Sequence, residues 1–105
     1  MSATPRFSAH TSAEGHTIDL AGELDIAAVP ALHEKIARLC GEGTPEVVID
    51  LSRLRFIDSA GLRLMLTAQS LCEANGCRLR LIPGPPNVQR VFEISGLLEH
   101  LPFAA

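Results

Sequence analysis

The stretch FIDSAGLRLML, Phe56 to Leu66, places a carboxylate, a hydroxyl and a glycine between two apolar runs. Apolar residues are dense before Asp58, as in a buried strand, and after Gly61 they recur at the spacing of a helix. A strand followed closely by a helix is the repeating unit of an α/β fold. The pattern therefore predicts an α/β protein and raises the question of why Asp58 and Ser59 stand side by side at this junction.

The segment after the junction predicts an amphipathic helix that ends at Asn75 and Gly76. We expect Ser59 to cap the helix, which would begin near Ala60, because serine is a favoured N-cap residue. Gly61 in the first turn indicates a close approach to a neighbouring strand. The core-facing side is expected to carry Gly61, Leu64, Met65, Ala68, Leu71 and Cys72.

Upstream of the junction, the nearly continuous apolar run in residues 46–52 predicts a strand in the middle of a sheet. An amphipathic helix is predicted before it, in residues 26–40, with Asp25 as its N-cap and Gly41 or Gly43 ending it. The expected buried stripe of this helix is Val29, Leu32, Ile36 and Leu39.

The two ends of the chain supply the remaining elements. Residues 7–11 and 17–24 alternate like the arms of a β-hairpin, with a turn at Glu14 and Gly15. Residues 77–82 alternate leucine and arginine, which predicts a strand with one exposed face. A short helix is expected in residues 87–95.

Together the elements follow the order β-β-α-β-α-β-α. Strands that alternate with helices imply a largely parallel sheet with right-handed crossovers. We predict an α/β fold with a mixed, mostly parallel β-sheet, opened by an N-terminal β-hairpin and covered by helices mainly on one face. No linker or repeat divides the 105 residues, so we expect a single domain over residues 1–105.

Composition excludes several classes of function. Hydrophobic residues make up 47% of the chain, which predicts a packed core. The formal net charge is −3, the arginines are scattered and Trp and Tyr are absent, which argues against nucleic-acid binding. No apolar run approaches the roughly 20 residues of a spanning helix, so membrane insertion is not expected. The N-terminus lacks a secretory apolar region, which predicts a cytoplasmic protein.

Metal and catalytic motifs are not found. Cys40, Cys72 and Cys77 form neither an even disulfide set nor a CxxC pair, so we expect them to be small, reduced core residues. The four histidines lack ligand spacing, and no metal site is predicted. The chain has no G-x-S-x-G motif and no glycine-rich phosphate loop. These features predict a protein that is not an enzyme.

The run VVIDLSRLRFIDSAGLRLML, with LAGELD before it and PNVQRVFEISGL after it, resembles the STAS-domain anti-sigma-factor antagonists of bacteria. The resemblance covers the chain from about Thr17 to Leu98. It implies a STAS fold and a binding module controlled by phosphorylation. In that family an anti-sigma factor that is a serine kinase phosphorylates the serine of D-S-x-G-L, which is Ser59 here.

In such a system the unphosphorylated protein binds the kinase and releases a sigma factor, and a PP2C-type phosphatase resets the phosphorylated form. The ATP belongs to the kinase, so the resemblance implies no cofactor on this chain. Partner-binding residues implied by the motif positions are Asp25, Asp58, Ser59, Ala60, Gly61, Leu62 and Arg63. Many relatives have a second hydroxyl residue where this chain has Ala60, so Ser59 is the one acceptor in the motif.

Some assignments stay open at the level of sequence. Arg63 lies four residues after Ser59, so it either neutralises part of a phosphate or is a solvated surface residue. Leu62 and Leu66 either pack beside the core or dock a partner. The alternative function is that of a STAS accessory subunit of a lipid-transport ATPase or another transporter, which binds without phosphorylation. A third option is an enzyme that uses Ser59 directly.

Overall fold

The computed structural model describes residues 5–104 and confirms the expected order of elements. The strands are β1 (Phe7–Thr11), β2 (Thr17–Leu24), β3 (Glu46–Ile57) and β4 (Arg78–Ile82), and the helices are α1 (Val29–Gly41), α2 (Ser59–Ala74) and α3 (Pro86–Ile94). The four strands form one sheet in the order β1-β2-β3-β4. The β1–β2 pair is antiparallel, whereas β3 is parallel to both β2 and β4, so the predicted mixed, mostly parallel sheet is confirmed.

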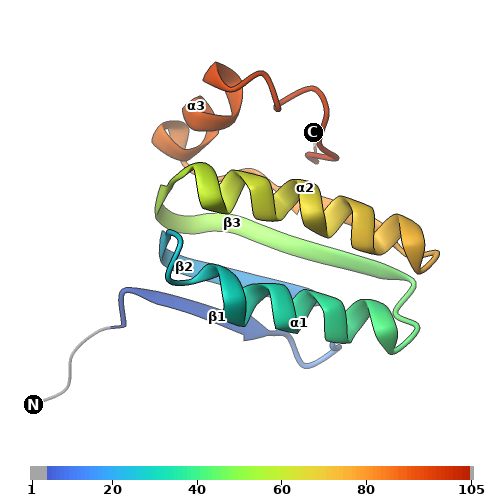
Figure 1. Cartoon of the computed structure of the whole chain (residues 1–105). Coiled ribbons are helices and arrows are strands. Elements are labelled where there is room, and N and C mark those ends of the chain that lie inside the picture. The colour runs from blue at the N-terminus through green and yellow to red at the C-terminus, as the bar shows by residue number, and fades with distance from the viewer. Residues whose placement is uncertain (1–4, 105) are drawn as a thin grey trace, which may run out of the picture.

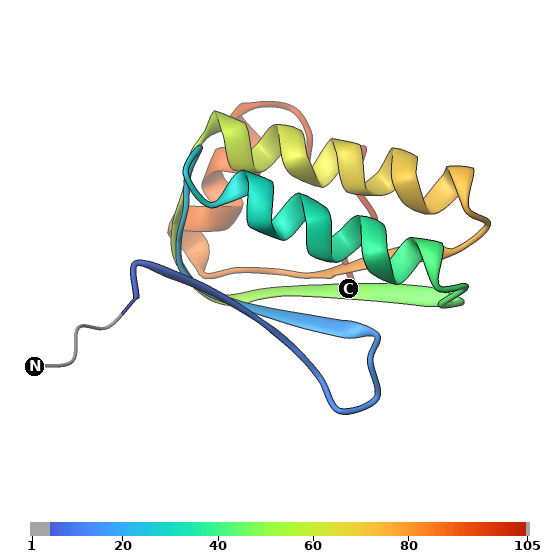
Figure 2. The same cartoon turned by 60° about the horizontal axis from the view of Figure 1, so that its bottom comes forward.

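Helices α1 and α2 lie side by side over one face of the sheet, as Figures 1 and 2 show. Their buried sides form the core together with the inward side chains of the strands. The predicted stripes are largely confirmed, with Leu32, Ile36 and Leu39 buried in α1 and Leu64, Met65 and Ala68 buried in α2. Among residues 5–104 no helix is long and apolar enough to cross a membrane.

Helix α3 packs against β3 and adds to the same core. Its buried residues are Val88 and Phe92. The ring of Phe103 meets the ring of Phe92 edge to face with centroids 5.0 Å apart. Phe103 also forms a parallel bridge with Leu81, so the last described residues extend the sheet past β4.

Strand β3 is longer than the predicted strand of residues 46–52, because it continues to Ile57. Two register shifts occur in its pairing with β2: Asp19 pairs with Asp50 and Ala21 with Arg53, and then Gly22 pairs with Leu54 and Glu23 with Phe56. Each shift inserts one extra residue into β3, as in a β-bulge.

The bulges change the spacing of the side chains that face the helices. Inward positions in the second half of β3 are Leu51, Leu54 and Ile57, three residues apart, although the inward positions of β2 remain two apart. An alternating pattern is the usual signal of a strand. It is lost here, which is why the sequence did not predict that one strand runs from residue 46 through to the strand-like residues Phe56 and Ile57.

Candidate functional site

The candidate site lies at the carboxyl ends of β2 and β3. These strands are parallel neighbours, and their last residues, Leu24 and Ile57, are paired. The backbone N–H of Asp58 donates to the carbonyl of Leu24 (3.2 Å). Asp25 and Asp58 each follow the end of one of these strands, so the fold brings the two predicted acidic residues to the same edge of the sheet.

Asp58, not Ser59, is the N-cap of α2. Its Oδ1 accepts hydrogen bonds from the backbone N–H groups of Ala60 (2.9 Å) and Gly61 (3.1 Å). Its backbone is extended, with φ −111° and ψ −173°, so it continues the conformation of β3. The expectation that Ser59 caps the helix was therefore wrong. The extended backbone that continues from β3 puts Asp58 at the N-cap position, where its carboxylate accepts from both amides and is favoured by the positive end of the helix.

Ser59 consequently occupies the first helical position, with its side chain exposed. Within the described part of the chain, its hydroxyl makes no hydrogen bond, to histidine or to any other residue. A nucleophilic serine needs a general base within hydrogen-bond reach. The arrangement lacks that partner and leaves the hydroxyl free to meet solvent or another protein.

The close approach predicted at Gly61 is confirmed. A Cβ at this position would lie 2.7 Å from Cγ1 of Ile57 and 2.9 Å from Cγ of Leu24. The first turn of α2 is therefore pressed against the ends of β2 and β3.

The two leucines beside the core stripe of α2 are Leu62 and Leu66. Leu62 is 7% exposed and packs in the core, which confirms flank packing for this leucine. Leu66 is partly buried against the same core.

Arg63 points to solvent from the same helix as Ser59 and forms no ion pair with any residue in the range 5–104. Ala60 is partly exposed. The first turn of α2 is therefore accessible to solvent at Ser59, Ala60 and Arg63, whereas Gly61 and Leu62 in the same turn are buried.

Asp25 does not cap α1, in contrast to the prediction. The helix begins at Val29, with Ala28 at the N-cap position and no side-chain cap. The Oδ1 of Asp25 instead accepts from the backbone N–H groups of Ala27 (3.1 Å) and Ala28 (3.3 Å). The physical reason is Pro30, which is tolerated only in the first turn and so holds the helix start close to itself.

Comparison with known proteins agrees with this geometry. The family model described as "Mlab, STAS domain" matches residues 8–102. The chain belongs to the STAS domain family. This STAS domain is 41% identical over 86 residues to BtrV of Bordetella bronchiseptica, whose name contains the words anti-sigma factor antagonist, with 81% of this chain and 73% of the relative covered. It is 30% identical over 82 residues to an anti-sigma-B factor antagonist of Staphylococcus epidermidis, covering 78% of this chain and 76% of the relative.

Solved structures similar to this STAS domain include the anti-sigma factor antagonist SpoIIAA in its unphosphorylated form, with 29% identity and a TM-score of 0.73 over 94% of this chain and 88% of that one. The Bacillus SpoIIAA in the phosphorylated form is also similar, with 29% identity and a TM-score of 0.66 over 94% of this chain and 91% of that one. An anti-sigma factor antagonist from Mycobacterium paratuberculosis, 23% identical, shares the fold with a TM-score of 0.82, over 98% of this chain and 89% of that one.

Sequence reasoning missed an ion-pair cluster at this edge of the STAS domain. The guanidinium of Arg6 contacts carboxylate oxygens of Glu23 (2.7 Å) and Asp25 (3.2 Å). Its hydrogen bond to Glu23 raises the pKa of Arg6. Arg55 approaches the other oxygen of Glu23 at 4.0 Å. Glu23 and Asp25 follow Arg6 by 17 and 19 positions, so no short-range sequence pattern predicts these contacts.

Two exposed apolar side chains at the same edge were also missed. Ile26, directly after Asp25, is 75% exposed, and Phe56, two residues before Asp58, is 46% exposed. The sequence placed Ile26 at the start of a helix. It placed Phe56 in an apolar run expected to be buried, whereas the structure leaves this side chain 46% exposed.

Proposed function

We propose that this chain is an anti-sigma-factor antagonist that binds an anti-sigma factor with serine-kinase activity, releases a sigma factor, and is switched off by phosphorylation of Ser59. The observation that carries the proposal is the state of Ser59: it is exposed at the start of α2, yet Asp58 performs the capping for which such a hydroxyl is normally used. The serine thus has no structural task in the described chain.

The relatives support this assignment. Curated relatives at 41% and 30% identity bear antagonist names, and SpoIIAA, which is 29% identical, is known in unphosphorylated and phosphorylated forms. As a regulatory binding protein, the chain would use no catalytic group or cofactor of its own. We place it in the cytoplasm, where a PP2C-type phosphatase would regenerate the active form.

The predicted partner-binding residues divide into two groups. Ser59 and Arg63 are exposed and Asp25, Asp58 and Ala60 are partly exposed, so these five can contact a partner. Gly61 and Leu62 are buried, and their role in binding is to fix the position of the first turn. We add two residues that extend the surface with apolar area, Ile26 and Phe56.

A charge switch at this position has a simple physical basis. Phosphorylation adds about −1.5 to −2 charges. The amides of Ala60 and Gly61 that would stabilise a phosphate already donate to the carboxylate of Asp58. The phosphate would therefore be poorly paired when a partner buries this surface. A hundredfold loss of affinity needs only about 2.7 kcal/mol, which is within the cost of burying such a charge.

The test is to incubate the chain with a panel of recombinant anti-sigma factor serine kinases and Mg-ATP, and then to map phosphate by mass spectrometry. Phosphate is expected on Ser59 and is lost in Ser59→Ala. Ser70→Ala is the matched control, because Ser70 is also an exposed serine on α2 and its removal leaves phosphorylation unchanged. Calorimetry of the kinase complex should show at least about a hundredfold weaker binding for Ser59→Asp.

A second candidate is an accessory subunit of a lipid-transport ATPase or another transporter. The observation that favours it is the matching family model, whose description names Mlab and not an antagonist. Stable association with a transporter ATPase that is equally tight for wild type and Ser59→Asp, together with no phosphate on Ser59 from any kinase, would establish this candidate over the first.

A further inference from the structure

All three cysteines of the chain meet at one point of the fold. Cys40 lies near the end of α1, Cys72 near the end of α2, and Cys77 directly before β4. The Sγ of Cys40 lies 3.5 Å from that of Cys72 and 3.7 Å from that of Cys77, and all three Sγ atoms lie within 4.8 Å of one another. None of the three is in a disulfide, and all are buried, which confirms the expectation that they are core residues. Their spacing in sequence did not predict the cluster, because three separate elements contribute to it.

The separations match those of sulfur ligands that share one ion. Bonds of about 2.3 Å to one shared centre place two sulfur atoms roughly 3.3 to 3.8 Å apart, the smaller value for a pyramidal centre and the larger for a tetrahedral one. The separations of 3.5 and 3.7 Å lie in that range. Small apolar residues of any type would fill a core position, so packing alone does not require that every cysteine of the chain occupy this one point.

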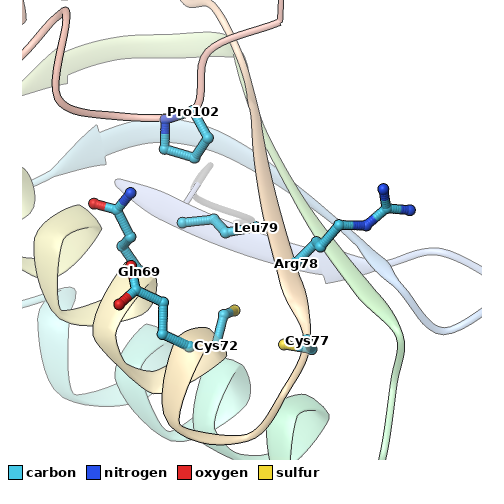
Figure 3. Close-up of a pocket in the computed structure, with 7 residues that line it drawn as sticks. Gln69, Cys72, Cys77, Arg78, Leu79 and Pro102 are labelled. Carbon is cyan, nitrogen blue, oxygen red and sulfur yellow. The ribbon is translucent and has the colours of Figure 1, made fainter.

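An open pocket of about 240 Å³ leads to the cluster. Cys72 and Cys77 line it together with Gln69, Glu73, Arg78, Leu79 and Pro102. Figure 3 shows the sulfur atoms of Cys72 and Cys77 pointing toward each other between α2 and β4, whereas the side chain of Arg78 points away from them. A small uncharged molecule that enters this pocket therefore meets Cys72 and Cys77 first, since Cys40 is not among the lining residues.

The surroundings favour an adduct without net charge. No residue in the range 5–104 with a polar or charged side chain is fully buried, so the core offers no group to balance a charge at the cluster. Three thiolates on a divalent ion carry one net negative charge, and burying an unbalanced charge is costly. Three thiolates on a trivalent centre are neutral.

We propose that Cys40, Cys72 and Cys77 form a binding site for a trivalent metalloid such as arsenic in arsenous acid. The reaction is a condensation: As(OH)₃ and three thiols give a tris-thiolate and three molecules of water. Three As–O and three S–H bonds break, three As–S bonds form, each hydroxyl leaves with a thiol proton, and nothing is oxidised or reduced.

The site is remote from Ser59. Cys72 lies thirteen residues after Ser59 in α2, which corresponds to roughly 20 Å along the helix axis. Its test is therefore independent of any anti-sigma partner and of the proposed switch.

The experiment uses the reduced full chain with sodium arsenite at neutral pH. Native mass spectrometry should show one added arsenic with loss of three hydrogens, thiol titration should fall from three reactive groups to none, and X-ray absorption should show three sulfur neighbours. Cys40→Ala, Cys72→Ala and Cys77→Ala should each weaken binding by roughly a hundredfold or more, because one of three linked ligands is lost. Circular dichroism checks that each variant is folded.

Several results would overturn the proposal. They are an arsenic adduct that retains a hydroxyl and has only two sulfur neighbours, unchanged arsenite binding in a folded Cys40→Ala variant, or tighter binding of Zn²⁺ than of arsenite by the wild type. X-ray absorption on the wild type decides the matter even where a variant does not fold.

Discussion

The two junctions at the carboxyl edge of the sheet begin alike but lead into their helices differently. At the first, Asp25 comes directly after β2, and at the second, Asp58 comes directly after β3. Each carboxylate accepts from the backbone N–H groups two and three residues later. After Asp58 the helix begins at once, whereas after Asp25 the chain makes a turn and α1 starts at Val29.

This difference separates a fixed junction from an adaptable one. The β3–α2 junction is held by the cap at Asp58 and by the contact of Gly61 with both strands. The β2–α1 junction is held by a side-chain turn and by exposed ion pairs with Arg6, and it presents the exposed Ile26. Ser59 therefore stands on the β3–α2 junction, the more rigid of the two, where the cap and the contact at Gly61 set its position.

The largest expected effect comes from Gly61→Ala, which removes the close contact that holds the rigid junction. The added Cβ would lie within 3.0 Å of atoms of Ile57 and Leu24, so one of the strands or the helix must shift. Overpacking of this kind costs about 1–3 kcal/mol in the free energy of unfolding. Urea denaturation of the two proteins measures the loss.

Gly41→Ala is the matched control, because Gly41 is also helical and a Cβ there meets nothing within 4 Å. It should leave stability unchanged or raise it by up to about 1 kcal/mol, since alanine favours helix. Equal stability of both alanine variants would show that the contact at Gly61 does not hold the junction.

An intermediate effect is expected from removing the two carboxylates. Asp58→Ala leaves two helix amides without their acceptor and should cost about 1 kcal/mol of unfolding free energy. Asp25→Ala should cost less than about 0.5 kcal/mol, because the Ala28 N–H keeps a backbone bond to the carbonyl of residue 25 (3.0 Å) and the ion pair with Arg6 is exposed. The two variants are compared by urea denaturation in one buffer, and a larger loss for Asp25→Ala would reverse the contrast between the junctions.

The smallest effect on stability is expected from Ser59→Ala. The hydroxyl makes no hydrogen bond in the described chain and Asp58 supplies the cap, so the free energy of unfolding should change by less than about 0.5 kcal/mol. Thermal and urea unfolding measure this change. A loss comparable to that of Asp58→Ala would mean that Ser59 has a structural role after all, and the main support for a regulatory serine would be removed.

The sequence predicted most of the fold because its periodic patterns are local. The stripes of α1 and α2 and the alternation of β2 indicate which side of each element is buried, and the structure confirms them. The sequence did not predict that the strand of residues 46–52 continues without a break to Ile57, because the bulges between them arise from pairing with β2, and pairing depends on a strand far away in the chain.

The same distinction applies to the site. The adjacent Asp58 and Ser59 marked the junction in the sequence. Both are good N-cap residues, so the local capping preference did not decide which of them caps α2. The extended backbone that continues from β3 decided it in favour of Asp58.

By itself the sequence determined the α/β class, the order of elements and the D-S-A-G-L junction, because each depends on residues only a few positions apart. Only the tertiary structure decided which residue caps α2, brought Asp25 beside the β3–α2 junction, and gathered Cys40, Cys72 and Cys77 into one cluster. These features depend on the packing of elements that are distant in the chain. Cys40, for example, lies 32 residues from Cys72 and 37 from Cys77, and no local pattern encodes such a separation.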